Sequence, residues 1–197
     1  DVFVPKDAES GPIKLKSALG ETLTKDSFFM PVRLAKPAKL AAKPVERVEF
    51  KGLNFHGLTA LNIGEQSVQF ELLSNAKLRF TVGEEWIGGG IKMVARGGSL
   101  ISTNSFAVLP RIDSFEPTIG PAGTMVTILG SGFHDIRFLK FGGGVAEFER
   151  KSSKELMARV PPNASTGPLG IITPDGEIAS EGIFTGTAAG DLQMTSR

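Results

Sequence analysis

The sequence of this chain predicts an all-β fold, built of small β-sandwiches arranged in tandem. Three observations support the prediction: apolar and polar residues alternate along short segments, turn residues recur about every ten positions, and long stretches repeat at a fixed spacing. The 197 residues include 24 glycines and 12 prolines, which suit many tight turns, and 14 phenylalanines, which supply most of the large core side chains. No segment combines a helical apolar stripe with a capping residue.

The repeat determines how the chain is organised. Residues 48–106 align without a gap on residues 126–184, which is an offset of 78 residues. The aligned pairs include Gly52/Gly130, Phe55/Phe133, His56/His134, Leu61/Leu139, Phe70/Phe148, Leu78/Leu156, Val82/Val160 and Phe106/Phe184. We expect these apolar residues to form the same core in each copy, because each copy has to bury them alike.

A further step of the same length reaches the N-terminus, where Val4, Gly11-Pro12 and Phe28 take the positions of Val160, Gly167-Pro168 and Phe184. The sequence therefore predicts four parts. They are the C-terminal remnant of a module at 1–31, complete modules at 32–109 and 110–187, and a tail at 188–197. Since the chain begins in mid-module, we expect it to be a piece of a longer protein.

The alternation of apolar residues predicts the individual strands. In the last module, strands are expected at 124–130, 136–141, 156–160 and 169–173. Pro161-Pro162 ends the third of these, because proline cannot donate to a strand ladder. Pro174-Asp175-Gly176 predicts a hairpin turn, since proline presets φ and glycine accepts a positive φ. In the first 47 residues, strands are expected at 2–4, 13–16 and 23–29, followed by a basic, solvated connection at 33–47.

Residues 110–187 resemble the IPT/TIG family. The resemblance depends on Gly123, Val126, Ile128, Gly130 and Phe133, which have the family's spacing G-x-x-V-x-I-x-G-x-x-F. Further matches are Pro117, Phe141-Gly142-Gly143, Val160-Pro161 and Gly167. The resemblance implies immunoglobulin-like, early-set β-sandwiches. Residues 32–109 depart from the pattern, with Ile63-Gly64-Glu65 in place of Phe-Gly-Gly, so they are assigned as a degenerate module through the repeat.

Composition excludes several kinds of chemistry. The chain has no cysteine, which removes disulfides, thiol nucleophiles and cysteine-type zinc sites. His56 and His134 occupy the same position in successive modules, so they cannot bind one ion, and both are expected to cap turns. No catalytic residues, metal site or cofactor is predicted, and we expect no enzyme activity. The net charge of +1 argues against nucleic acid, and no apolar run is long enough for a membrane span.

One loop stands out as a candidate binding site. Trp86 is the single tryptophan, and it follows Glu84 and Glu85 in a segment that aligns with a loop of the last module. An exposed tryptophan beside carboxylates can stack on a sugar or anchor a protein contact. The alternative is that Trp86 covers a module junction or the neighbouring Gly88-Gly89-Gly90.

The resemblance places these modules in a family whose members occur in surface proteins, phage tail proteins, glycan-binding lipoproteins and plexin-type receptors. In most of these proteins the domain serves as a spacer or interaction module. The function we expect is a non-enzymatic structural or adhesive spacer that makes protein–protein contacts at an extracellular or bacterial surface, or on a virion. The alternatives are a glycan-binding module, or accessory domains of a carbohydrate-active enzyme. Residues 1–31 are expected either to accept a strand from a neighbouring chain, which gives self-association, or to dock on the next module.

Overall fold

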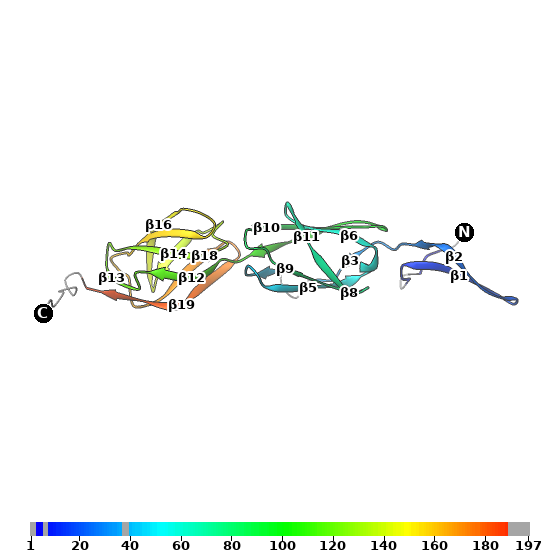
Figure 1. Ribbon diagram of the computed structural model, residues 1–197, viewed down its shortest axis with the longest axis horizontal. Helices are drawn as coiled ribbons and strands as arrows, with labels where there is room; N and C mark the ends of the chain where they lie inside the picture. Colours follow the sequence, from blue (N-terminus) through cyan, green and yellow to red (C-terminus); the bar gives the residue numbers. More distant parts are fainter. Residues whose placement is uncertain (1–2, 6–7, 37–39, 189–197) are drawn as a thin grey trace. The chain divides into compact units, whose positions relative to one another are not determined.

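The computed structural model describes residues 3–5, 8–36 and 40–188, and these residues form β-strands with one short 3-10 turn. The all-β prediction is confirmed. The chain divides into two compact units (Figure 1). The first contains Asp1–Leu40, Glu46–Thr81 and Gly88–Phe106, and the second contains Ala41–Val45, Val82–Ile87 and Ala107–Arg197. The predicted tail falls outside the described residues except for Ala188.

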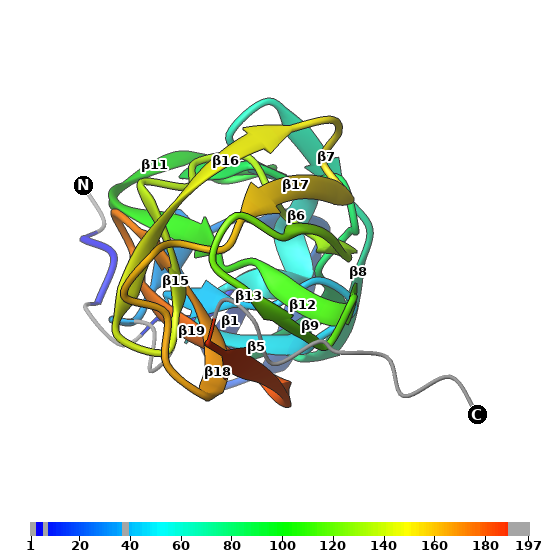
Figure 2. The same ribbon diagram turned by 90° about the vertical axis from the view of Figure 1, so that its left-hand side faces the viewer.

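Among the described residues of the second unit, eight strands follow one another in a single hydrogen-bonded order, β12-β14-β17-β16-β15-β18-β19-β13. The strands are β12 (Arg111–Glu116), β13 (Ile119–Pro121), β14 (Met125–Ser131), β15 (Phe138–Phe141), β16 (Gly144–Arg150), β17 (Glu155–Arg159), β18 (Gly167–Thr173) and β19 (Gly176–Thr187). Strand β16 joins two layers, because its first residues pair with β15 and its last residues pair with β17. Figure 2 shows β15, β18 and β19 on one side of this unit and β12 and β17 on the other.

Apolar side chains at alternate positions of the strands fill the space between these layers. In β14, Val126 and Ile128 are fully buried, while Met125 and Leu129 are exposed. Among the residues predicted for this core, Phe133, Leu139, Leu156, Val160 and Phe184 are buried, whereas Phe148 is only partly buried against the cluster. Buried apolar side chains that point inward alternate with exposed side chains that point outward, as expected for a strand of a two-layer sandwich.

Besides an N-terminal hairpin, the described residues of the first unit form two sheets. One has the order β3-β5-β9-β8, and the other contains β11-β10-β6-β7. The strands are β3 (Arg33–Leu34), β5 (Arg47–Leu53), β6 (Leu58–Ile63), β7 (Gln66–Val68), β8 (Phe70–Ser74), β9 (Lys77–Thr81), β10 (Gly88–Ala95) and β11 (Gly98–Val108). The 3-10 turn Phe55–Gly57 precedes β6. Phe50, Phe80 and Phe106 pack edge to face at the centre of this core, with ring centroids 5.0–6.1 Å apart.

The 78-residue repeat recurs in the hydrogen bonds of the two cores. The N–H of Gly52 donates to the carbonyl of Ala76, and the N–H of Gly130 donates to that of Lys154, both at 2.9 Å. Likewise, Phe55 donates to Asn75, as Phe133 donates to Ser153. Residues at the same module position therefore have the same backbone environment in both units.

The region before residue 47 differs in part from the prediction. Strands β1 (Gly11–Ser17) and β2 (Gly20–Phe28) form a hairpin at the expected place. Residues 3 and 4 are not in a strand, and Val2 lies outside the described residues. The segment 33–47, expected to be a solvated connection, instead contributes β3 and β4 (Ala41–Ala42), and Ala42 is buried. A parallel pairing of β4 with residues 107–108 explains its burial.

Candidate functional site

The loop that carries the predicted site belongs to the second unit, together with the residues that it contacts. Val82 fixes its start, because this side chain is fully buried. A turn follows, in which the N–H of Trp86 donates to the carbonyl of Gly83 at 3.4 Å. The turn leaves Glu84 and Glu85 exposed at its tip.

The opposite side of the site is the turn at residues 152–154, between β16 and β17. Two hydrogen bonds fix the backbone of this turn. The carbonyl of Ser153 accepts from the N–H of Phe133 at 3.0 Å, and the carbonyl of Lys154 accepts from the N–H of Gly130 at 2.9 Å. The hydroxyl of Ser152 accepts a further bond from the N–H of Lys154 at 3.1 Å. A turn fixed in this way presents its side chains in one arrangement.

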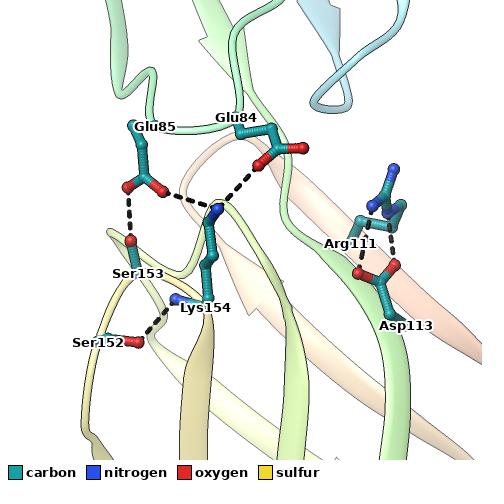
Figure 3. A network of polar contacts seen from close by, with 7 residues as sticks. All are labelled: Glu84, Glu85, Arg111, Asp113, Ser152, Ser153 and Lys154. Carbon is teal, nitrogen blue, oxygen red and sulfur yellow. Dashed lines mark hydrogen bonds and ion pairs between the residues drawn. The ribbon is translucent and has the colours of Figure 1, made fainter.

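Lys154 and Ser153 bind both glutamates of the loop (Figure 3). The Nζ of Lys154 lies 2.8 Å from Oε2 of Glu84 and 3.3 Å from Oε1 of Glu85. The hydroxyl of Ser153 donates to Oε2 of Glu85 at 2.6 Å. One ammonium and one hydroxyl therefore hold two adjacent carboxylates, although about half of each charged side chain remains exposed.

The contacts shift the ionisation of these groups. The hydrogen bond from Ser153, followed by the contact with Lys154, lowers the pKa of Glu85 below its ordinary value, since both favour the charged carboxylate. His134 adds a small charge effect in the same direction. The hydrogen bonds to Glu84 and then to Glu85 raise the pKa of Lys154. The network is thus most stable with all three charges present.

Trp86 follows Glu85 in the loop, and its side chain packs on the backbone of Gly83. Its indole ring covers Gly83 so closely that an added Cβ at Gly83 would lie 2.6 Å from Cδ1 of the ring. The side chain is half-buried, and the neighbouring Ile87 is 66% exposed. The contact with Gly83 accounts for part of the buried face of Trp86, and the predicted cover over a module junction or over Gly88-Gly89-Gly90 stays a prediction.

A second ion pair lies to one side of the network. The guanidinium of Arg111 binds the carboxylate of Asp113 through two contacts, at 2.6 and 3.2 Å. Figure 3 shows it apart from Lys154, with no dashed line joining the two pairs. Asp113 raises the pKa of Arg111, and the charge of Glu84 in the loop adds a smaller effect in the same direction.

The structure thus brings Glu84 and Glu85 together with two residues that the sequence did not point to, Lys154 and Ser153. The repeat gave no signal for them, since Asn75 and Ala76 occupy the same positions in the first unit. Across the described residues, no group of three or more His, Cys, Asp or Glu side chains could hold a metal ion. In the same part of the chain, no helix has the length and apolar character needed to cross a membrane.

Residues 110–186 match the IPT/TIG domain family, so this part of the chain is an IPT/TIG domain with an immunoglobulin-like fold. A search of curated proteins found no match. Similar solved structures include a surface glycan-binding protein from Prevotella bryantii, with 14% identity and a TM-score of 0.45 over 93% of this chain and 42% of that one.

Two further structures are similar over 80% of this chain. One is an SGBP-B from a xyloglucan utilization locus in Bacteroides uniformis, with 18% identity, a TM-score of 0.36 and 49% of that chain covered. The other is the plexin A4 extracellular region, with 14% identity, a TM-score of 0.37 and 18% of that chain covered. The chain spans less than half the length of each of these three structures.

Proposed function

We propose that this chain is a non-catalytic spacer and interaction segment of a protein at the cell surface. It would be built from tandem immunoglobulin-like modules. The IPT/TIG domain at 110–186 supports the class of protein. The virion alternative receives no support from the similar structures, and the accessory-domain alternative stays a prediction.

The attachment of the loop at 82–87 is the observation that supports a spacer best. Glu84 and Glu85 have their charges bound by Lys154 and Ser153, within the same compact unit. Lys154 already balances part of the charge of both carboxylates, so these groups would gain less from a cationic partner, and they favour holding the chain together over capturing one. Partners of a spacer would be other proteins, and strand addition at residues 1–31 is one route to such a contact.

Glycan binding is the second candidate. The similar structures named as glycan-binding proteins have TM-scores below 0.5, so the candidate rests on the loop itself. Trp86 is half-buried on Gly83, and the fixed glutamates beside it hold the turn in place. An indole held in one orientation loses little entropy when a sugar ring stacks on it.

Tryptophan fluorescence separates the two functions, because Trp86 is the single tryptophan in the chain. The probes are xyloglucan oligosaccharides, with a charged and an uncharged control oligosaccharide. A spacer predicts no saturable change in emission. A saturable change, together with calorimetric binding that is lost in Trp86→Ala and kept in Ile87→Ala, would replace the spacer with a glycan-binding module.

A further inference from the structure

The hairpin β1–β2 has the same register as the hairpin β18–β19. Gly11 pairs with Phe28 as Gly167 pairs with Phe184, and Leu15 pairs with Thr22 as Ile171 pairs with Ile178. Both ladders are irregular at the same place, between Pro12 and Lys14 and between Pro168 and Gly170. The two hairpins therefore put equivalent residues on the same face.

A side-chain hydrogen bond confirms the equivalence. The hydroxyl of Thr24 accepts from the N–H of Ile13 at 2.8 Å, and the hydroxyl of Ser180 accepts from the N–H of Leu169 at 2.9 Å. Each hydroxyl then donates to a carbonyl two residues further on, at 2.7 and 2.6 Å. The N-terminal hairpin is built as the last two strands of an IPT/TIG-like module.

The equivalent faces differ in burial. Four apolar positions of this module end are at most 1% exposed in both complete copies: Val82, Ile91, Met93 and Phe106, and Val160, Leu169, Ile171 and Phe184. The same positions in the N-terminal copy are 42–59% exposed: Val4, Ile13, Leu15 and Phe28. A hollow of ≈ 360 Å³ adjoins this face. Among the described residues this face of the hairpin is therefore uncovered, and its docking on the next module stays a prediction.

The edge of β1 is open as well. In the second unit, β15 pairs antiparallel with residues 169–172 of β18, and in the first unit β6 pairs in the same way with residues 91–94 of β10. The equivalent edge in the hairpin is Ile13–Lys16, and among the described residues β1 pairs with β2 alone. An exposed edge with an apolar face is a template for another strand.

We propose that this face and edge receive the remaining strands of an IPT/TIG-like module, supplied by a polypeptide segment outside this chain. One strand of that segment lies antiparallel to residues 13–16, in the register that Phe138–Phe141 takes on β18. Its inward side chains are apolar and pack on Leu15 and Phe28. This inference goes beyond the spacer function, and it holds whether or not the loop at Trp86 binds a glycan.

The outward side of the strand has a defined chemistry. Lys14 and Lys16 occupy the alternate positions of β1, and both bind Glu21 at 2.8 and 3.2 Å. Two ammonium groups share one carboxylate, so the outward positions of the incoming strand favour acidic or polar side chains. A second copy of this chain would not supply β6 or β15, the strands that take this position in the complete modules, because both already have neighbours on both sides.

Two chimeras supply the missing strands from the chain's own modules. One places residues 110–166 directly before Gly11, since Gly167 is the equivalent of Gly11, and the other places residues 32–88 there. Hydrogen exchange by mass spectrometry then reports on the amides of β1 and β2. We expect exchange at residues 13–16 at least about tenfold slower than in the parent chain in one chimera or both. Leu15→Asp in that chimera should return the exchange to the parent rate.

Two results would overturn the proposal. One is exchange in β1–β2 as fast as in the parent chain in both chimeras, which means that an IPT/TIG strand set does not cover the hairpin. The other is a parent chain whose mass in sedimentation equilibrium rises with concentration and falls to that of a monomer with Leu15→Asp. That result would assign the face to a second copy. Neither measurement uses Trp86 as its probe or depends on glycan binding, so the outcome can be distinguished from that of the test of the spacer function.

Discussion

Phe141 and Phe184 meet edge to face in the core of the second unit, with ring centroids 4.9 Å apart and an interplanar angle of 84°. Both rings are fully buried. Their contact links β15 to β19, two strands that are 35 or more positions apart in the chain. In the sheet these strands are separated only by β18. Contacts of this kind stabilise a sandwich beyond the area that the rings bury.

Phe184→Ala should therefore destabilise the second unit strongly. Removal of a buried phenylalanine costs about 3–5 kcal/mol, which is a large part of the stability of a small domain. Chemical denaturation monitored by circular dichroism would show a lower transition midpoint for this unit. Phe138→Ala is the matched control, because Phe138 lies on the same sheet and is 50% exposed. A loss of under about 1 kcal/mol in Phe184→Ala would contradict its place in the core.

Gly130 is required by a close approach of the backbone. An added Cβ would collide with the carbonyl oxygen of Arg111 and would lie 2.6 Å from Cζ of Phe133. Gly130→Ala should therefore cost about 1–3 kcal/mol, because the nearest atom belongs to the backbone and has little freedom to move. The free energy of unfolding, measured in urea, tests this expectation.

Gly143→Ala is the control for that variant. A Cβ at Gly143 meets no atom within 4 Å, and its φ is not positive. The substitution should be neutral or stabilise by up to about 1 kcal/mol, since alanine restricts the unfolded chain. Equal effects at the two glycines would show that packing at Gly130 is not the cause.

The hydroxyls of Ser180 and Thr24 make the same hydrogen bond in different surroundings. Ser180 is buried beside Leu169, whereas Thr24 and Ile13 are exposed. Ser180→Ala should cost about 1–3 kcal/mol, because it leaves the buried N–H of Leu169 without its acceptor. Thr24→Val should change the stability by less than about 0.5 kcal/mol, since water can reach the N–H of Ile13. Urea unfolding of both variants would reveal the difference, and comparable losses would contradict the exposure of the hairpin.

Much of this fold could be predicted from the sequence. The alternation of apolar residues predicted β14, and Pro174-Asp175-Gly176 predicted the turn between β18 and β19. Both signals are local properties of the sequence, so they can be read without tertiary structure. The repeat then predicted that Phe55 and Phe133, like Phe106 and Phe184, are buried alike, and all four are. Phe70 and Phe148 show the limit of the same argument, since both repeat and both are only partly buried.

The candidate site could be predicted only in part. Glu84, Glu85 and Trp86 stood out by composition, but their partners Lys154 and Ser153 lie about 70 positions away along the chain. No spacing rule links a loop between two strands to a turn so far along the chain, because the contact depends on tertiary structure. The short strands β3 and β4 were missed for a similar reason: their residues pair with distant strands, and their basic composition predicted a solvated segment.

The carboxylate of Glu85 provides the last prediction. Its pKa is lowered mainly by the hydrogen bond from Ser153 and secondarily by Lys154. A lowered folded-state pKa means that the contact stabilises the loop above the ordinary carboxyl pKa, and that the stabilisation is lost as the pH falls through the folded value. Acid should therefore release the loop at 82–87, and its protection against hydrogen exchange, taken relative to the intrinsic rate at each pH, should fall before that of the strands of the second unit.

Titration of the Glu85 carboxyl by carbon NMR identifies the cause. The midpoint should rise in Ser153→Ala and also in Lys154→Met, because both contacts lower the pKa of Glu85. Lys151→Met is the matched control, because Lys151 binds Glu149 at 2.7 Å and no contact joins it to Glu85 in the network. A midpoint that stays fixed in Ser153→Ala would show that the hydroxyl does not hold this carboxylate, and the loop would then depend on Lys154 alone.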